Sequence, residues 1–188
     1  MKKKLKISYN APVVLTFVLL CFLVTLIGLL TGSRSTTLLF SAYRGSVTNP
    51  LTYLRLFTHV LGHSGLDHFI GNGMYLLLLG PLLEEKYGSA TMLKVILATA
   101  LVTGVVHCVL WSNTALCGAS GVVFAFIVLS SFTAFKEGEI PLSFLLVAIL
   151  YVGQEVSSGL LIADNVSNLT HIIGGVVGAS AGYMLNRK

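Results

Sequence analysis

The sequence predicts an all-α membrane protein, a compact bundle of six transmembrane helices in one domain over residues 1–188, with a long first extracytoplasmic loop. Charged residues make up only 10% of the chain, whereas an ordinary soluble domain has about 25%. Apolar residues supply 55%, which leaves too few polar side chains to cover a globular surface. Uncharged runs reach the ~20 residues that a membrane span needs. This composition excludes a soluble domain, a disordered chain and a collagen-like fibre.

The first predicted helix covers residues 11–31, inside a run without charge from Ile7 to Ser33. A lysine cluster precedes it, so the segment is also similar to a secretory signal. Its apolar run is longer than the usual ~7–15 residues of such a signal, and no clear Ala-x-Ala site follows. We therefore expect this segment to remain as a membrane span. The connection after it, residues 32–67, is the predicted long first loop.

Five more helices follow from the remaining apolar runs. The uncharged run 95–135 is long enough for two helices, with a break at Trp111-Ser112-Asn113. The runs do not alternate between polar and apolar residues as the strands of a membrane barrel do. The predicted helices are 68–84, 92–111, 118–135, 140–159 and 169–186.

The distribution of lysine and arginine predicts the orientation in the membrane. Six spans place both ends of the chain on one side, together with Lys2, Lys3, Lys4, Lys6, Lys86, Lys94, Lys136, Arg187 and Lys188. The other side has Arg34, Arg44 and Arg55. Because cytoplasmic loops carry the excess of cations, both termini are predicted to be cytoplasmic. The net charge of +5 then reflects topology and not nucleic-acid binding. We expect the protein to lie in a plasma membrane, of bacterial type.

Polar side chains at membrane depth are costly and are therefore candidates for function. Three predicted helices, 68–84, 118–135 and 169–186, run in the same direction, so their first residues share the outer depth. Each of these helices begins with a polar cluster. The clusters are His68 with Asn72, Gly118-Ala119-Ser120-Gly121, and His171 with Gly174 and Gly178.

These residue types suit nucleophilic catalysis. A serine needs a base to remove its proton, and a neutral histidine can serve, so Ser120 and His171 form a candidate dyad. The tetrahedral oxyanion would be bound by His68, Asn72 and the Ser120 N–H. A structural alternative remains open. Small residues such as Gly174 and Gly178 suit helix packing in any case, and a lone histidine at a helix end is commonly a hydrogen-bonding group.

Other ligand chemistry has less support in the sequence. His59, His63 and His68 could supply imidazoles to a metal ion in a carrier protein, because zinc favours such ligands. However, HExxH is absent, and so are P-loop and dinucleotide motifs, so we expect neither a metal nor a cofactor. No CxxC pair exists, which leaves apolar packing as the expected role of the cysteines, Cys21, Cys108 and Cys117.

From about Arg55 to Gly182 the chain resembles the rhomboid family of intramembrane serine proteases. His68-Phe-Ile-Gly-Asn72 is similar to the family's HxxxN motif, and Gly118-Ala-Ser120-Gly121 to its GxSG motif. His171 with its two glycines is similar to the histidine and glycines of the sixth helix. The resemblance implies Ser120 as nucleophile, His171 as base, an oxyanion site of His68, Asn72 and the Ser120 N–H, and single-pass transmembrane proteins as substrates.

The sequence departs from the family pattern at four positions. Leu54 replaces a tryptophan before Arg55, and Phe124 stands where a tyrosine is common, which leaves a ring to pack on His171 without a hydroxyl. Val166 and Thr170 replace a glycine and an alanine before His171. None of these changes removes a catalytic group. The alternative is a rhomboid-like protein without catalysis that binds transmembrane helices.

Overall fold

The computed structural model describes residues 7–133, 142–143, 145–146, 149–150 and 165–187. Within these ranges the regular structure is helical, with one isolated bridge between Ala42 and Leu116 and no strand. The helices are α1 (Pro12–Leu30), α2 (Arg34–Leu39), α3 (Pro50–Thr58), the 3-10 turn η1 (His59–Leu61), α4 (Leu66–Tyr87), α5 (Ser89–Leu110), α6 (Ser120–Ser131) and α8 (Asn165–Leu185).

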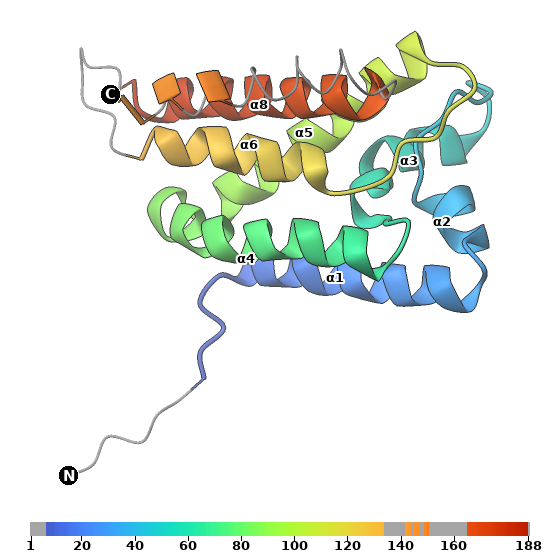
Figure 1. The fold of residues 1–188 in the computed structure, drawn as a ribbon, viewed down its shortest axis with the longest axis horizontal. Helices are drawn as coiled ribbons and strands as arrows, with labels where there is room; N and C mark the ends of the chain where they lie inside the picture. The colour runs from blue at the N-terminus through green and yellow to red at the C-terminus, as the bar shows by residue number, and fades with distance from the viewer. Residues whose placement is uncertain (1–6, 134–141, 144, 147–148, 151–164, 188) are drawn as a thin grey trace.

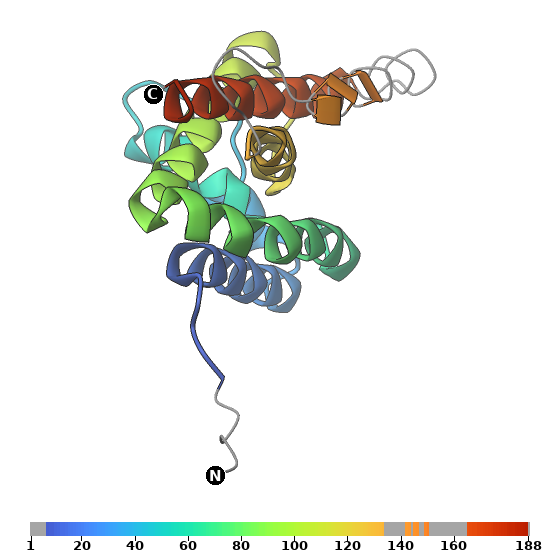
Figure 2. The ribbon, with the colours of Figure 1, turned by 90° about the vertical axis from the view of Figure 1, so that its left-hand side faces the viewer.

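The long helices form a layered bundle (Figure 1). Helix α4 lies along α1, α6 lies between α4 and α8, and α5 crosses behind them, as the turned view also shows (Figure 2). The most extensive contact joins α6 to α8, followed by that of α1 with α4. Helices α4, α6 and α8 all begin at the same end of the bundle (Figure 1). The polar clusters at their first turns are therefore placed at one level.

Within the described part of the chain, two helices, α1 and α5, are long and apolar enough to cross a membrane by length and composition. Their outward faces are apolar, with Leu23 44%, Ile27 47% and Val109 63% exposed. Such a continuous apolar surface is unusual on a soluble monomer. Helix α6 is apolar but short, since it ends at Ser131. The bundle of six spans therefore remains a prediction.

The helix ends differ from the predicted ones by one to four residues, and the backbone at Gly88 explains the difference between α4 and α5. The predicted gap between the second and third helices is reduced to Gly88, whose φ of +80° allows α5 to start one residue after it. This left-handed conformation is one that glycine adopts without a steric penalty. Helix α8 begins at Asn165, four residues before the predicted start at 169. The predicted helix 140–159 falls mostly outside the described residues, which include helical positions at 142–143, 145–146 and 149–150.

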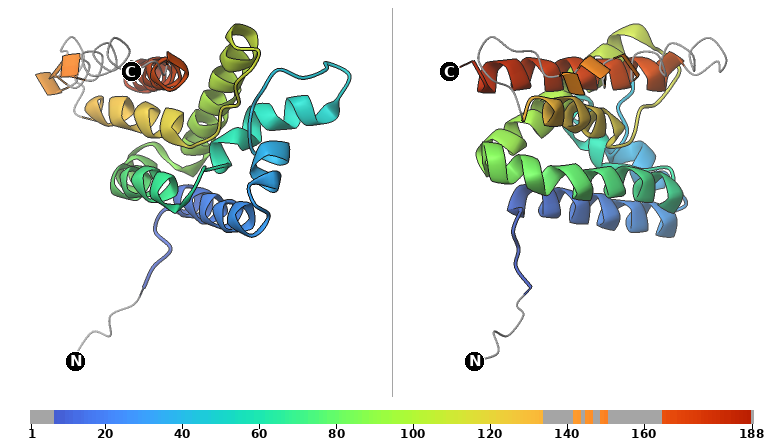
Figure 3. Two further views of the ribbon diagram at one scale, coloured as in Figure 1. Left: turned by 45° about the vertical axis from the view of Figure 1, so that its right-hand side comes forward. Right: turned by 60° about the vertical axis from the view of Figure 1, so that its left-hand side comes forward.

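The segment 32–67 is a folded element and not a plain loop. It contains α2, α3 and η1, and Figure 3 shows these short helices gathered at the end of the bundle where α4 begins. Its only bridge pairs Ala42 with Leu116 through two backbone hydrogen bonds of 2.8 Å. The guanidinium of Arg44 also donates to the carbonyl oxygens of Cys108 and Val109, at the end of α5. The segment is thereby tied to the chain that leads into α6.

Arg55 is the interior anchor of this segment. Its side chain is only 4% exposed, and its Nε donates to the carbonyl oxygen of Leu38 at 2.7 Å. The guanidinium also lies 4.2 Å from the centre of the Tyr43 ring, a cation–π arrangement. Leu54, which precedes Arg55, is 46% exposed and takes no part in this anchor. The arginine is therefore anchored in the interior although no tryptophan stands before it.

Candidate active site

A cavity of about 640 Å³ opens between the first turns of α4, α6 and α8. All four residues with a predicted chemical role, Ser120, His171, His68 and Asn72, line it. The sequence separates them by up to 103 positions, from His68 to His171. The other lining residues are Asp67, Gly71, Tyr75, Leu116, Cys117, Val123, Phe124, Ile127 and Leu150. The structure therefore brings the three polar clusters together at one site.

Ser120 is the first residue of α6, and the chain before it is held from the first loop. The N–H of Gly118 donates to the carbonyl oxygen of His59 at 3.0 Å, and the N–H of Ala119 donates to Nε2 of His63 at 3.5 Å. The first N–H groups of a helix have no partner within the helix. The N–H of Ser120 is therefore a donor at the positive end of the α6 dipole.

His68 presents its Nε2 side to Gly118. Its Nδ1 lies 3.1 Å from the Ser64 hydroxyl and 3.5 Å from the Ser64 N–H, which can only donate. Nδ1 therefore acts as an acceptor, and the proton of the neutral ring is on Nε2. A β-carbon built on Gly118 would lie 2.9 Å from that Nε2. The glycine is required at this position, because its φ of +128° also disfavours any side chain.

Asn72 adds a second donor to the same wall. Its side chain is 8% exposed, and its Nδ2 is buried without a hydrogen-bond partner among the described residues. A β-carbon built on Gly118 would lie 3.8 Å from this nitrogen. Buried donors without a partner are rare in proteins and costly. Asn72 and His68 therefore present donors to the space beside Gly118.

His171 lies in the second turn of α8, where the ring of Phe124 packs against it. The two ring centroids are 4.3 Å apart and the planes are inclined by 36°. The predicted ring contact is therefore present, although Phe124 has no hydroxyl. Thr170, which stands where the family often has alanine, is 5% exposed and faces Gly121. Its side chain is therefore accommodated inside the α6–α8 contact. Val166 has a side chain outside the described part of the chain.

The glycines of α8 lie outside the cavity and set the distance between α6 and α8. A β-carbon at Gly174 would overlap the carbonyl oxygen of Gly121, and one at Gly178 would overlap that of Ala125. Only a residue without a side chain fits this close approach of two helices. The expected role of these glycines in helix packing is confirmed, and the helix that they contact is α6. The contact holds His171 beside the start of α6.

The first-loop histidines serve as hydrogen-bonding groups. Nε2 of His59 donates to the carbonyl oxygen of Ala100 at 3.0 Å, and Nδ1 of His63 donates to that of Leu61 at 3.2 Å. Burial lowers the pKa of His59 to about 4, and burial together with the neighbouring His68 lowers the pKa of His63 to about 4. In the described ranges no cluster of three or more His, Cys, Asp or Glu side chains could hold a metal ion.

Several lining residues were not singled out by the sequence. Asp67 and Tyr75 lie on the same face of α4 as Gly71, at spacings of four residues, so the helical period could have indicated them. Cys117 also lines the cavity and is only partly buried, and Cys108 is partly exposed too. The expectation of buried packing therefore holds for Cys21 alone. Burial raises the pKa of the Cys117 thiol, so it is a poor nucleophile.

The rhomboid domain model matches residues 50–188, which is most of the chain and includes every residue of the site. The chain belongs to the rhomboid family. No curated protein matches it. Membership in the rhomboid family and the apolar helices together indicate a membrane protein. The match begins at the first residue of α3, so α1 and α2 lie outside it.

Proposed function

We propose that this rhomboid is an intramembrane serine endopeptidase that cleaves single-pass transmembrane proteins in or near the membrane. The observation that carries the proposal is the cavity that Ser120 and His171 share. Beside them lie the Nε2 side of His68 and the Asn72 Nδ2, which has no hydrogen-bond partner among the described residues. One wall thus offers a nucleophile and a base, and the adjoining wall offers donors. This is the division that acyl transfer needs.

The reaction would proceed in two halves. His171 takes the proton of the Ser120 hydroxyl as Oγ attacks the scissile carbonyl carbon, and the oxygen of the tetrahedral intermediate becomes negative. Nε2–H of His68, Nδ2–H of Asn72 and the Ser120 N–H donate to that oxygen. His171 then gives its proton to the leaving amine, and an acyl-enzyme remains. Water, activated by His171, releases the second product and restores Ser120.

The site has no need of a metal or an organic cofactor in this scheme. Water reaches it through the cavity, and the wall formed by Val123, Phe124 and Ile127 is apolar enough to receive a transmembrane segment. With the orientation that the lysine and arginine distribution favours, the cavity would open on the outer face of a plasma membrane, with both termini in the cytoplasm. The substrates would then be membrane proteins cut near their extracytoplasmic end.

Cleavage of single-pass substrates by the purified protein tests the proposal. We expect Ser120→Ala and His171→Ala to abolish cleavage without loss of folding, and we expect a fluorophosphonate probe to label the wild type at Ser120. Ser130→Ala is the matched control, because its hydroxyl is on the same helix and bonds only to the carbonyl oxygen of Ile127. Cleavage retained in Ser120→Ala would refute the mechanism. Substrate binding by a wild type that is not labelled would instead indicate a rhomboid without catalysis.

A further inference from the structure

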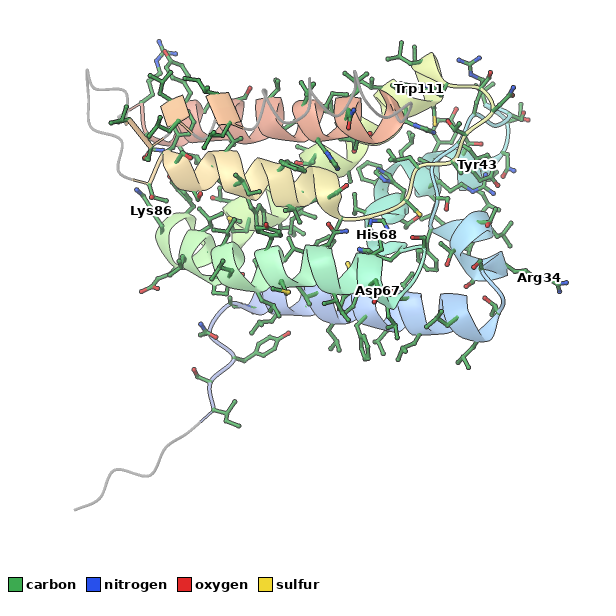
Figure 4. The ribbon with its side chains drawn as sticks, viewed as in Figure 1. Arg34, Tyr43, Asp67, His68, Lys86 and Trp111 are labelled. Carbon is green, nitrogen blue, oxygen red and sulfur yellow. The ribbon has the colours of Figure 1, made fainter. Side chains whose placement is uncertain are left out.

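The cavity wall contains a carboxylate that the proposed mechanism does not use. Asp67 lines the cavity directly before His68 in the sequence. Among the described lining residues it is the only one with a charged side chain at neutral pH, given neutral histidines. Figure 4 shows Asp67 and His68 together at the beginning of α4.

The position of Asp67 on α4 places it at the mouth of the cavity. Asp67, Gly71 and Tyr75 follow one another at intervals of four residues along the same face, and all three line the cavity. At a rise of ~1.5 Å per residue, Asp67 lies about 6 Å above Gly71 and about 12 Å above Tyr75 along the helix axis. Gly71 and Tyr75 are uncharged, so the negative charge on this face of α4 is confined to its first turn, at Asp67.

The Asp67 carboxylate is exposed, and it makes no hydrogen bond or ion pair with another described residue. An acidic residue in the first turn of a helix is favoured by the helix dipole, and this effect alone would account for an exposed aspartate. It would not account for a carboxylate on the wall of the cavity that contains the reacting groups. A cationic ligand inside the cavity could approach it without displacing another partner.

We propose that Asp67 makes the site select substrates with a lysine or arginine beside the scissile bond, on the side of the bond that extends toward the beginning of α4. This inference rests on the proposed function and deepens it, because it names the substrate class. A cationic side chain of the substrate at that position pairs with the Asp67 carboxylate at the cavity mouth. The apolar part of the substrate's transmembrane segment then contacts Val123, Phe124 and Ile127. A glutamate at the same substrate position meets a like charge and is disfavoured.

The size of the preference follows from the exposure of the pair. An ion pair at a solvent-accessible site changes affinity by about two- to fivefold. Charge repulsion against glutamate changes it in the opposite sense, so lysine and glutamate substrates should differ by about five- to twentyfold in kcat/KM. The difference should shrink with added salt, because counter-ions screen exposed charges. Increased ionic strength should not reduce cleavage of a neutral substrate.

The test uses the full chain in proteoliposomes and one single-pass substrate that carries lysine, glutamine or glutamate at each position flanking its mapped cut. We expect the wild type to prefer lysine at a flanking position. Asp67→Asn should remove that preference, Asp67→Glu should restore it and Asp67→Lys should reverse it. Glu85→Gln is the matched control, since Glu85 is exposed at the other end of α4 and its substitution changes the net charge equally. A lysine-to-glutamate ratio unchanged by Asp67→Asn would overturn the inference.

A binding measurement separates this inference from the proposed activity. In the Ser120→Ala background, the affinity for labelled lysine and glutamate substrates is compared with and without Asp67→Asn. A lysine preference that depends on Asp67 supports the inference even if the wild type cleaves nothing, an outcome that would refute only the proposed protease activity. Cleavage of the neutral substrate together with equal affinities for all three charges would retain the protease and exclude the role of Asp67.

Discussion

The imidazoles of His63 and His68 meet edge to face, with ring centroids 5.0 Å apart and planes at 73°. Each ring also contacts one of the two residues before Ser120. His63 accepts the N–H of Ala119, and His68 lies against Gly118. The Ala119 contact requires a neutral ring, because a protonated His63 has no lone pair left for the Ala119 N–H. The hydrogen bond that holds the residue before Ser120 therefore depends on the protonation state of His63.

We expect this dependence to appear as a loss of stability in acid. The pKa of His63 is lowered from 6.5 to about 4, mainly by burial and also by His68. The folded state thus resists a proton that the unfolded chain accepts. The contribution of His63 to stability is complete above about pH 6.5, decreases as the pH falls, and is fully lost below about pH 4. The total loss is about 3 kcal/mol.

Thermal unfolding in detergent between pH 4 and 8 checks this expectation. His63→Gln keeps an acceptor where Nε2 lies but does not titrate, so its unfolding midpoint should decline less steeply with acid than that of the wild type. His59, whose pKa is also lowered to about 4, remains in both proteins, so its contribution cancels in the comparison. Parallel pH profiles for the two proteins would contradict the assignment to His63.

The ring of Phe124 should determine the orientation of His171. Phe124→Leu removes the aromatic face that packs at 4.3 Å between centroids, and the imidazole gains freedom to turn away from Ser120. Because misplacement of a catalytic group by about 1 Å can cost ~100-fold, we expect kcat to fall by about ten- to a hundredfold with little change in KM. Phe124→Tyr keeps the ring, and its kcat should stay close to that of the wild type. Equal kcat values for the leucine and tyrosine variants would exclude this positioning role.

The sequence predicted the parts of this protein that depend on local pattern. The bounds of α1, the end of α5, the common level of His68, Ser120 and His171, and the packing role of Gly174 and Gly178 follow from apolar run length, helix direction and four-residue spacing. The first loop did not follow from these rules. Its short helices depend on contacts that distant residues make, such as the hydrogen bond from Arg55 to Leu38.

The same limit applies to the site. The candidate catalytic groups were predicted because serine, histidine and asparagine are conspicuous in apolar helices. Asp67 and Cys117 were missed, since a charge at a helix start and a thiol in a loop have ordinary explanations. Their relevance comes only from the cavity that three helices create together.

Glu84 should contribute strongly to stability at the opposite end of α4. Its carboxylate is 4% exposed and accepts the Val13 and Val14 N–H groups, at 3.0 and 2.9 Å, and the Ser89 hydroxyl at 2.6 Å. It therefore caps the first turn of α1 and ties that helix to the start of α5. Glu84→Gln keeps one side-chain oxygen as an acceptor and replaces the other by an amide NH2. That NH2 group then faces one of the donors that the carboxylate had accepted.

We expect Glu84→Gln to lower the free energy of unfolding by about 2–3 kcal/mol, the range for lost hydrogen bonds to a buried charged group. Denaturant unfolding in mixed micelles measures this change. Glu85→Gln, at the exposed neighbouring position, should stay within ~0.5 kcal/mol of the wild type. A Glu84→Gln protein as stable as the Glu85→Gln protein would show that the cap is dispensable.

The spacing of α6 and α8 should limit activity through Gly174. A β-carbon there would overlap the Gly121 carbonyl oxygen and would lie 3.0 Å from the Gly121 Cα, which is backbone and cannot rotate away. Gly174→Ala must therefore move α8, and His171 one turn earlier moves with it. We expect a stability loss of about 1–3 kcal/mol from overpacking and a fall in kcat of about ten- to a hundredfold.

Two further variants separate packing from catalysis at this contact. Gly178→Ala meets the Ala125 carbonyl oxygen one turn farther from His171, so it should cost similar stability but less kcat. Ser180→Val adds comparable volume on the exposed face of α8 and should change neither quantity much. Unfolding midpoints and kcat on one substrate give both readouts. If Gly174→Ala and Gly178→Ala reduced kcat equally, the loss would follow from general destabilisation, and the distance between His171 and Ser120 would not be the limiting quantity.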